Sequence, residues 1–184
     1  MENGALVPEK SFRVDCDTVL LSVGLVPENE LSRAAGIELS AVTGGPVVDS
    51  RLMTNVDGVF ACGNVLHVHD LVDWVAKESR SAGRFASQWL EGGRPAMQLK
   101  ALAGANVRYV NPGRINPESE NCVYLRSMMV KNDAVLELRL DERIIRSVNQ
   151  RYVQPSEMIN VVIGPKDFKG LNVNSESILE FRIR

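Results

Sequence analysis

The sequence predicts an α+β protein in which a partial α/β segment is followed by a small antiparallel β-sandwich domain. Two patterns support this prediction. An apolar run at residues 59–62 leads through a glycine turn into a helical pattern at residues 71–90, as in α/β domains. Beyond residue 105, apolar and polar side chains alternate with a period of two, as in half-buried strands. We therefore expect two domains, at residues 1–95 and 105–184.

Residues 54–64, TNVDGVFACGN, describe a strand that ends in a narrow turn. A turn at residues 55–58 precedes the apolar run, which is typical of a strand buried on both faces of a parallel sheet. Gly63 follows at once, and a residue without a Cβ at the carboxyl end of such a strand lets the backbone approach a ligand closely. Asn64 then offers an amide donor and a carbonyl acceptor to a sugar hydroxyl or a phosphate oxygen.

A long helix is expected after this turn, with Asp70 as its capping residue. The unpaired N–H groups of its first turn would face the ligand. The partial positive charge of a helix start suits the electron-rich N1 and O2 edge of a reduced isoalloxazine ring. The sequence therefore predicts a flavin site, and its candidate cofactor-binding residues are Gly63, Asn64, Asp73, Trp74 and Val75.

The body of this helix is predicted from apolar side chains at helical spacing and from its end signals. Gly92, Gly93 and Pro95 should end it. Its apolar face is expected to consist of Leu71, Val75, Ala82, Ala86 and Trp89.

Residues 54–64 resemble the second FAD-binding motif of the pyridine nucleotide-disulfide oxidoreductase superfamily, T-x-x-x-G-[VI]-[FY]-A-x-G-D. Residues 16–29, CDTVLLSVGLVPEN, resemble the return of that family's chain from the NAD(P) domain into the FAD domain. The resemblance implies a Rossmann-like FAD-binding segment, with FAD as cofactor and NAD(P)H as electron donor or acceptor. At the position of Asn64 the family normally has Asp, which holds a ribitol hydroxyl, and Asn can still accept that hydrogen bond without the charge.

Two further motifs of that family do not occur in this sequence. No G-x-G-x-x-G turn is present to hold a pyrophosphate, and no C-x-x-C dithiol is present. We therefore expect the chain to be the carboxyl-terminal portion of a FAD-dependent NAD(P)H oxidoreductase, inactive on its own. Its partner would be the missing N-terminal FAD/NAD(P)-binding region. No catalytic residue is assigned.

Composition excludes several other classes. A hydrophobic fraction of 45% and a charged fraction of 24% are ordinary for a soluble globular protein, and a net charge of -2 argues against nucleic-acid binding. No apolar run is long enough to span a bilayer, so a cytoplasmic protein is expected. Cys16, Cys62 and Cys122 are odd in number and far apart, which does not describe a disulfide framework, and Cys62 is interpreted as a buried structural thiol.

His67 and His69 are the only histidines in the chain, and they stand beside Asp70. Because further ligands are lacking nearby, no metal site is predicted. The favoured interpretation is a loop with solvated side chains. The alternative places one imidazole near the flavin or substrate, where it could move protons alongside hydride transfer.

The second domain is predicted from short strands joined by tight turns, including a turn at residues 131–133. The expected strands are residues 107–110, 122–130, 134–140, 143–153, 158–163 and 177–183. Residues 151–158, RYVQPSEM, are similar to an R-x-x-x-P-x-E-M stretch in oxidoreductases associated with anaerobic glycerol-3-phosphate metabolism. From the residues alone, Pro155 makes a turn that Glu157 helps to cap.

A different class of function is also compatible with these patterns. Half of a FAD domain would leave sheet edges open, and pairing between copies would close them. The chain would then be a non-catalytic interaction or oligomerisation module that retains a flavin-like motif, and it would form a homo-oligomer.

Overall fold

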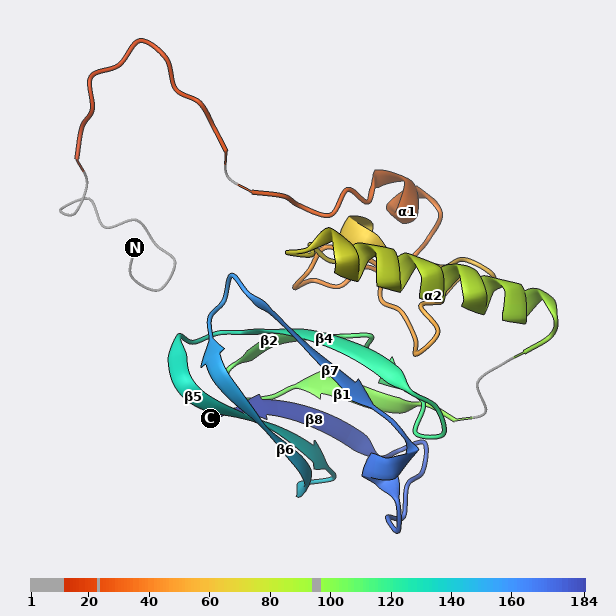
Figure 1. Ribbon diagram of the computed structural model, residues 1–184. Helices are drawn as coiled ribbons and strands as arrows, with labels where there is room; N and C mark the ends of the chain where they lie inside the picture. The colour runs from red at the N-terminus through yellow and green to blue at the C-terminus, as the bar shows by residue number, and fades with distance from the viewer. Residues whose placement is uncertain (1–11, 23, 94–96) are drawn as a thin grey trace.

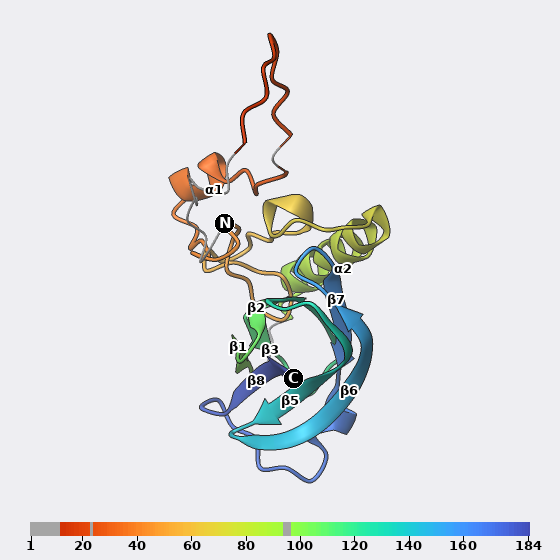
Figure 2. The same ribbon diagram turned by 90° about the vertical axis from the view of Figure 1, so that its left-hand side faces the viewer.

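The structure is a computed structural model that describes residues 12–22, 24–93 and 97–184. A helix-containing segment up to residue 93 lies over one side of a β domain formed by residues 99–183 (Figures 1 and 2). The β domain contains the larger hydrophobic core, with 18 buried residues. The smaller core of the first segment consists of Val48, Leu52, Ala61, Leu66 and Ala82.

Residues 12–22 form no regular secondary structure and extend away from the rest of the molecule (Figure 1). The first helix, α1, is a short one at Glu30–Ala34.

The strand predicted at residues 59–62 does not belong to a parallel sheet, so this prediction is wrong. The only pairing of these residues is an isolated antiparallel bridge between Met53 and Phe60. A buried parallel strand needs a neighbour on each side, and the described residues of this segment supply none.

The predicted helix is present as α2, Val72–Leu90, but Leu71 rather than Asp70 is its N-cap residue, and no side chain caps it. Its end follows the prediction at Gly92 and Gly93, whereas Pro95 lies outside the described residues. Gly92 has a φ of 84°, its N–H donates to the Trp89 carbonyl, and the Gly93 N–H donates to the Gln88 carbonyl. This pair of bonds is a Schellman motif, which requires the left-handed backbone that glycine adopts without strain.

Trp89 also fixes the turn that precedes the apolar run. Its indole N–H donates to an Asp57 carboxylate oxygen at 2.9 Å. A Cβ on Gly58, whose φ is 78°, would lie 3.0 Å from the Trp89 ring. The motif glycine is therefore needed both for its backbone conformation and for the close approach of α2.

The β domain consists of two sheets that curve around a common interior (Figure 2). The five-stranded sheet has the order β3-β1-β8-β5-β6, and the three-stranded sheet has the order β2-β4-β7. The strands are β1 Leu99–Ala103, β2 Val107–Asn111, β3 Arg114–Ile115, β4 Asn121–Ser127, β5 Lys131–Leu140, β6 Arg143–Val153, β7 Met158–Ile163 and β8 Ile178–Ile183.

The two-sheet arrangement agrees with the expected β domain, with three differences. Strands β1 and β3 were not predicted, and β1 begins before residue 105. The sheets are not wholly antiparallel, because β1 pairs with β8 in parallel. The turn predicted at residues 131–133 is wrong, since Lys131 and Asn132 pair with β6 and the chain turns at residues 128–130 instead.

Alternation correctly identifies the inward face of the central strands. Leu136, Leu138 and Leu140 of β5 are at most 5% exposed, and Leu179, Phe181 and Ile183 of β8 are at most 1% exposed. A pleated strand sends alternate side chains to opposite faces, so these six residues share the core between the sheets. Within the described residues, no helix is both long enough and apolar enough to cross a membrane.

Candidate flavin-binding turn and buried histidine–carboxylate cluster

The motif turn is held against α2 by a hydrogen bond from the backbone. Gly63 begins the 3-10 helix η2, Gly63–Val65, with a φ of 71°. Its N–H donates to Glu78 Oε2 at 2.5 Å. A Cβ at Gly63 would lie 3.4 Å from a methyl carbon of Val75. The turn and the first part of α2 are therefore in direct contact, as the flavin-site hypothesis requires.

Asn64 lies next to this contact and is exposed. Its side-chain Oδ1 accepts a hydrogen bond from the His69 backbone N–H at 3.1 Å, which braces the loop before α2. The oxygen is thus used within the chain, which leaves the side-chain N–H₂ group as the available donor.

The start of α2 places the other candidate residues at the same end of the molecule. Asp73 is exposed, whereas Trp74 and Val75 are half-buried. The Trp74 ring meets Tyr124 edge-on with centroids 6.1 Å apart. The structure therefore brings Gly63, Asn64 and the first turn of α2 together, and their role in binding a cofactor stays a prediction.

Both histidines are buried, so their interpretation as solvated loop residues is wrong. His67 is 1% exposed and His69 is 8% exposed. His67 Nε2 lies 3.1 Å from Glu78 Oε1, and His69 Nε2 lies 3.0 Å from Glu78 Oε2. Glu78 is itself 3% exposed, so the carboxylate and both imidazoles form one buried cluster.

Three donors stabilise the negative charge of Glu78. Burial alone would raise the pKa of this carboxyl, but hydrogen bonds from His67, His69 and the Gly63 N–H outweigh it and lower the pKa to about 2. A carboxylate that accepts several N–H bonds stays ionised even inside a protein. Glu78 is therefore a buried anion whose partners come from the motif turn and from the loop that follows it.

Burial lowers the pKa of His67 despite the opposing effect of Glu78. A neutral imidazole that donates its Nε2–H to Glu78 has a free Nδ1 acceptor. This Nδ1 lies 3.3 Å from the Tyr109 hydroxyl on β2. Burial raises the pKa of Tyr109, so its O–H stays available as a donor. The Nδ1 atom of His69 is buried without a hydrogen-bond partner.

His67, His69 and Glu78 could also hold a metal ion, because their ligand atoms lie within 4.8 Å of one another. No further His, Cys, Asp or Glu joins this group in the part of the chain that the structure describes. Both Glu78 oxygens already accept hydrogen bonds from the imidazoles. A closed zinc site needs four ligands, so the arrangement fits a hydrogen-bonded cluster better than a metal centre.

Asp70 joins the helix-containing segment to the β domain instead of capping α2. Its carboxylate accepts hydrogen bonds from Arg126 on β4 and from the Met158 N–H. Arg126 also donates to the Val68 carbonyl at 3.0 Å and to the Pro155 carbonyl at 3.4 Å. The motif at residues 151–158 therefore lies against the loop that leads into α2.

Pro155 stands in the predicted turn between β6 and β7, and the backbone N–H of Glu157 donates to the Gln154 carbonyl.

The three cysteines are free thiols, of which Cys16 is exposed and Cys62 and Cys122 are half-buried. Cys62 directly precedes η2 and packs against the smaller core, but it is half-buried rather than buried as expected, and its structural role stays a prediction.

Sequence reasoning missed the central residue of the cluster. Glu78 lies three residues after Val75 and four before Ala82, so it interrupts the apolar stripe of α2 at a position that faces inward. A charged residue at such a position is a signal that a buried partner is present. Tyr109, Tyr124 and Arg126 carried no comparable signal, because β-domain pairing brings them to the cluster.

The comparisons with known proteins agree with the position of the motif turn. Residues 2–84 match the family described as pyridine nucleotide-disulphide oxidoreductase, so this segment is similar to a family that uses FAD and NAD(P)H. This match supports the superfamily that residues 16–29 and 54–64 indicated. No solved structure gives a significant match to the chain.

Two curated relatives illustrate the range of the similarity. The nitric oxide reductase FlRd-NAD(+) reductase of Salmonella heidelberg (strain SL476) is 29% identical over 153 residues, which cover 72% of this chain and 39% of that protein. The glutamate synthase [NADPH] small chain of Azospirillum brasilense is 34% identical over 79 residues, which cover 42% of this chain and 16% of that protein. The chain thus spans less than half the length of these relatives.

Proposed function

We propose that this chain is the carboxyl-terminal portion of a FAD-dependent NAD(P)H oxidoreductase, supplying the second wall of the flavin site together with a β domain. The observation that carries the proposal is a run of exposed apolar side chains before and within α1. Leu20 is 91% exposed and Leu31 is 87% exposed. The exposed members of this run are Phe12, Val14, Val19, Leu20, Leu21, Leu25, Val26 and Leu31.

Apolar surface of this extent is typical of a surface that another part of the protein covers. The five-residue core of the helix-containing segment is small for a segment of this length, which also supports a missing neighbour. The relatives extend well beyond the matched region, and both are named as pyridine nucleotide-linked enzymes. A preceding FAD/NAD(P)-binding region would bury the run and supply the neighbouring strands that residues 59–62 lack.

The donor groups around the motif turn fit a flavin. When bound, FAD would accept a hydride from NAD(P)H and pass two electrons to an acceptor. Asn64 would hydrogen-bond a ribitol hydroxyl through its side-chain N–H₂ group, because its Oδ1 already accepts the His69 N–H. The start of α2, which no side chain caps, would stabilise negative charge at the flavin edge. The association with glycerol-3-phosphate metabolism rests on the motif at residues 151–158 and stays a prediction.

Flavin content tests the proposal. The 184-residue chain and the product of the longest reading frame that contains it are purified in parallel, and their visible absorbance is recorded. We expect flavin only in the longer product, and we expect Asn64→Leu to reduce its FAD content while Asn132→Leu leaves it unchanged. A longer product without flavin, or equal FAD content in both Asn variants, would contradict the proposal.

The alternative of a homo-oligomerisation module has one supporting observation in the β domain. The edge strand β6 exposes Ile144 at 46% and Tyr152 at 42%. An unpaired edge with apolar side chains can pair with a second copy. Size-exclusion chromatography with light scattering distinguishes the two functions, because a monomeric chain that gains FAD with its N-terminal region favours the enzyme.

A further inference from the structure

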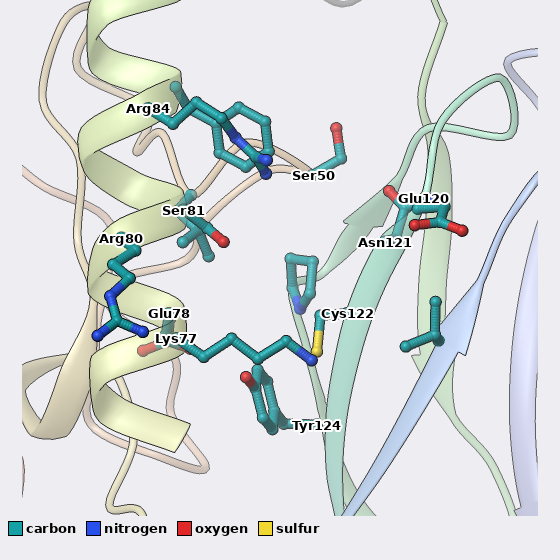
Figure 3. Close-up of a pocket in the computed structure, with 14 residues that line it drawn as sticks. Ser50, Lys77, Glu78, Arg80, Ser81, Arg84, Glu120, Asn121, Cys122 and Tyr124 are labelled. Carbon is teal, nitrogen blue, oxygen red and sulfur yellow. The ribbon is translucent and has the colours of Figure 1, made fainter. Parts of the chain in front are cut away.

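A cavity of about 470 Å³ lies between α2 and β4, and Glu78 is one of the residues that line it (Figure 3). Its α2 wall includes Lys77, Ser81 and Arg84. The opposite wall is formed by residues 120–122 and by Tyr124. A volume of this size is in the range of pockets that hold small metabolites.

The positive charges on the α2 wall lack carboxylate partners. Among the described residues, no ion pair involves Lys77, Arg80 or Arg84. The charged groups of Lys77 and Arg84 lie near aromatic rings instead, with Lys77 Nζ 5.3 Å from the Trp74 ring centroid and the Arg84 guanidinium 5.1 Å from that of Phe85. Residues at positions 77, 81 and 84 share one helix face, so their polar groups converge on the same space.

The two carboxylates that line the cavity do not neutralise these cations. Glu78 is buried and already accepts hydrogen bonds from His67, His69 and the Gly63 N–H. Glu120 belongs to the β-domain wall, and Figure 3 shows it across the cavity from Lys77. In the same view the Lys77 side chain extends from α2 in the direction of β4. The α2 wall therefore presents unpaired positive charge to the cavity.

The remaining walls offer both apolar surface and an unused hydroxyl. Leu52, Phe85, Pro112 and Val162 supply apolar contacts. Ser50, which is 9% exposed, has a buried Oγ atom without a hydrogen-bond partner. An unpaired buried hydroxyl costs free energy unless a ligand or water satisfies it. A ligand with an apolar body and an anionic end would match both parts of the cavity.

We propose that this cavity binds a small organic anion, whose carboxylate or phosphate group is held by Lys77 and Arg84. The site is separate from the flavin turn, and its occupation does not require FAD. Glu78 lines the cavity and also accepts a hydrogen bond from the Gly63 N–H. An anion bound in the cavity would therefore be separated from the motif turn by the Glu78 side chain.

The test uses the complete 184-residue chain and two probes, inorganic phosphate and succinate, titrated by calorimetry at constant ionic strength with chloride as the balancing anion. We expect saturable binding of at least one probe. The probe that binds more tightly identifies whether the site prefers phosphate or carboxylate. Lys77→Gln and Arg84→Gln should each weaken binding about tenfold, as expected for the loss of one charge-assisted hydrogen bond.

Matched control variants remove equivalent charges elsewhere. Lys100→Gln and Arg143→Gln alter exposed cations that do not line the cavity, and they should leave the affinity unchanged. The proposal is overturned if neither probe binds, if chloride competes as well as they do, or if the control variants weaken binding as much as the cavity variants.

A second readout follows the cavity directly. Cys122 lines it and is a free thiol. Alkylation of Cys122, measured by peptide mass spectrometry, should slow when the tighter probe is bound, whereas alkylation of the exposed Cys16 should not. Equal rates at Cys122 with and without the probe would place the anion elsewhere and reject the proposed site.

Discussion

Gly63 and Glu78 are joined by a hydrogen bond of 2.5 Å from the glycine N–H to the carboxylate Oε2 atom. This bond connects the motif turn to the middle of α2 across 15 residues. The same carboxylate bonds to both imidazoles, so the position of the turn depends on the charge of one buried side chain. Removing that charge should affect every element that meets at the cluster.

Replacement of Glu78 by Gln should lower the free energy of unfolding by about 2–4 kcal/mol, because charge-assisted bonds to buried donors are lost and an amide N–H₂ then faces an imidazole N–H. Urea denaturation followed by circular dichroism measures the change. Glu91→Gln, at the exposed end of α2, should change stability by less than about 0.5 kcal/mol. A similar stability loss in both variants would show that the cluster contributes nothing specific.

Stability should also fall in acid, in two separate steps. The pKa of His67 is lowered from 6.5 in the folded chain, so the unfolded chain binds the proton more readily and folding weakens as the pH falls below about 6.5. The pKa of Glu78 is lowered from 4.5 to about 2, so its contribution is present above about pH 4.5 and is lost as the pH falls toward 2.

Urea titrations between pH 8 and pH 5 test the first step. In the wild-type chain the midpoint should decrease with falling pH. In His67→Gln the decrease between pH 7 and pH 5.5 should be smaller, since the titrating group has been removed. An unchanged slope in this variant would mean that His67 binds protons equally in the folded and unfolded chain.

Gly58→Ala should destabilise the chain by about 2–4 kcal/mol, through a left-handed backbone and a contact with the Trp89 ring. Gly36→Ala is the matched control. Gly36 has a similar φ of 73°, but a Cβ there would meet no atom within 4 Å, so only the backbone cost of about 1–2 kcal/mol should remain. Equal losses in thermal denaturation would show that the Trp89 contact is unimportant.

Periodicity predicted the parts of the fold whose pattern is local. Helix α2 and the inward faces of β5 and β8 follow from apolar spacing alone, because a helix and a half-buried strand each repeat over a few residues. Pairing partners are not local. Strand β1 was missed because Leu99 and Ala101 are its only buried side chains, and its pairing with β8 joins residues about 80 positions apart in the chain.

The candidate site was predicted only where its parts are adjacent in sequence. Gly63, Asn64 and the start of α2 were identified together because all of them lie within residues 63–72. The burial of His67 and His69 was not predicted, since their partner Glu78 lies 11 and 9 positions further along the chain and was given no role from the sequence. Asp70 was assigned to the nearest helix start, whereas its strongest partner, Arg126, comes from β4.

The contact of Asp70 with Arg126 joins the loop before α2 to the β domain. The two side chains are 30% and 12% exposed, so solvent screens their attraction only in part. Asp70→Asn and Arg126→Gln, made singly and together, form a double-mutant cycle in urea denaturation. We expect a coupling free energy of about 1–2 kcal/mol, since each side chain also orders groups around the other. Arg146 and Asp167, whose pair lies within the β domain at 3.3 Å, provide the comparison cycle.

If the loop is fixed by Asp70 and Arg126, the loss of these side chains should also speed proteolysis at residues 68–71, whereas loss of Arg146 and Asp167 should not. Unchanged proteolysis together with zero coupling would mean that the buried cluster alone positions this loop.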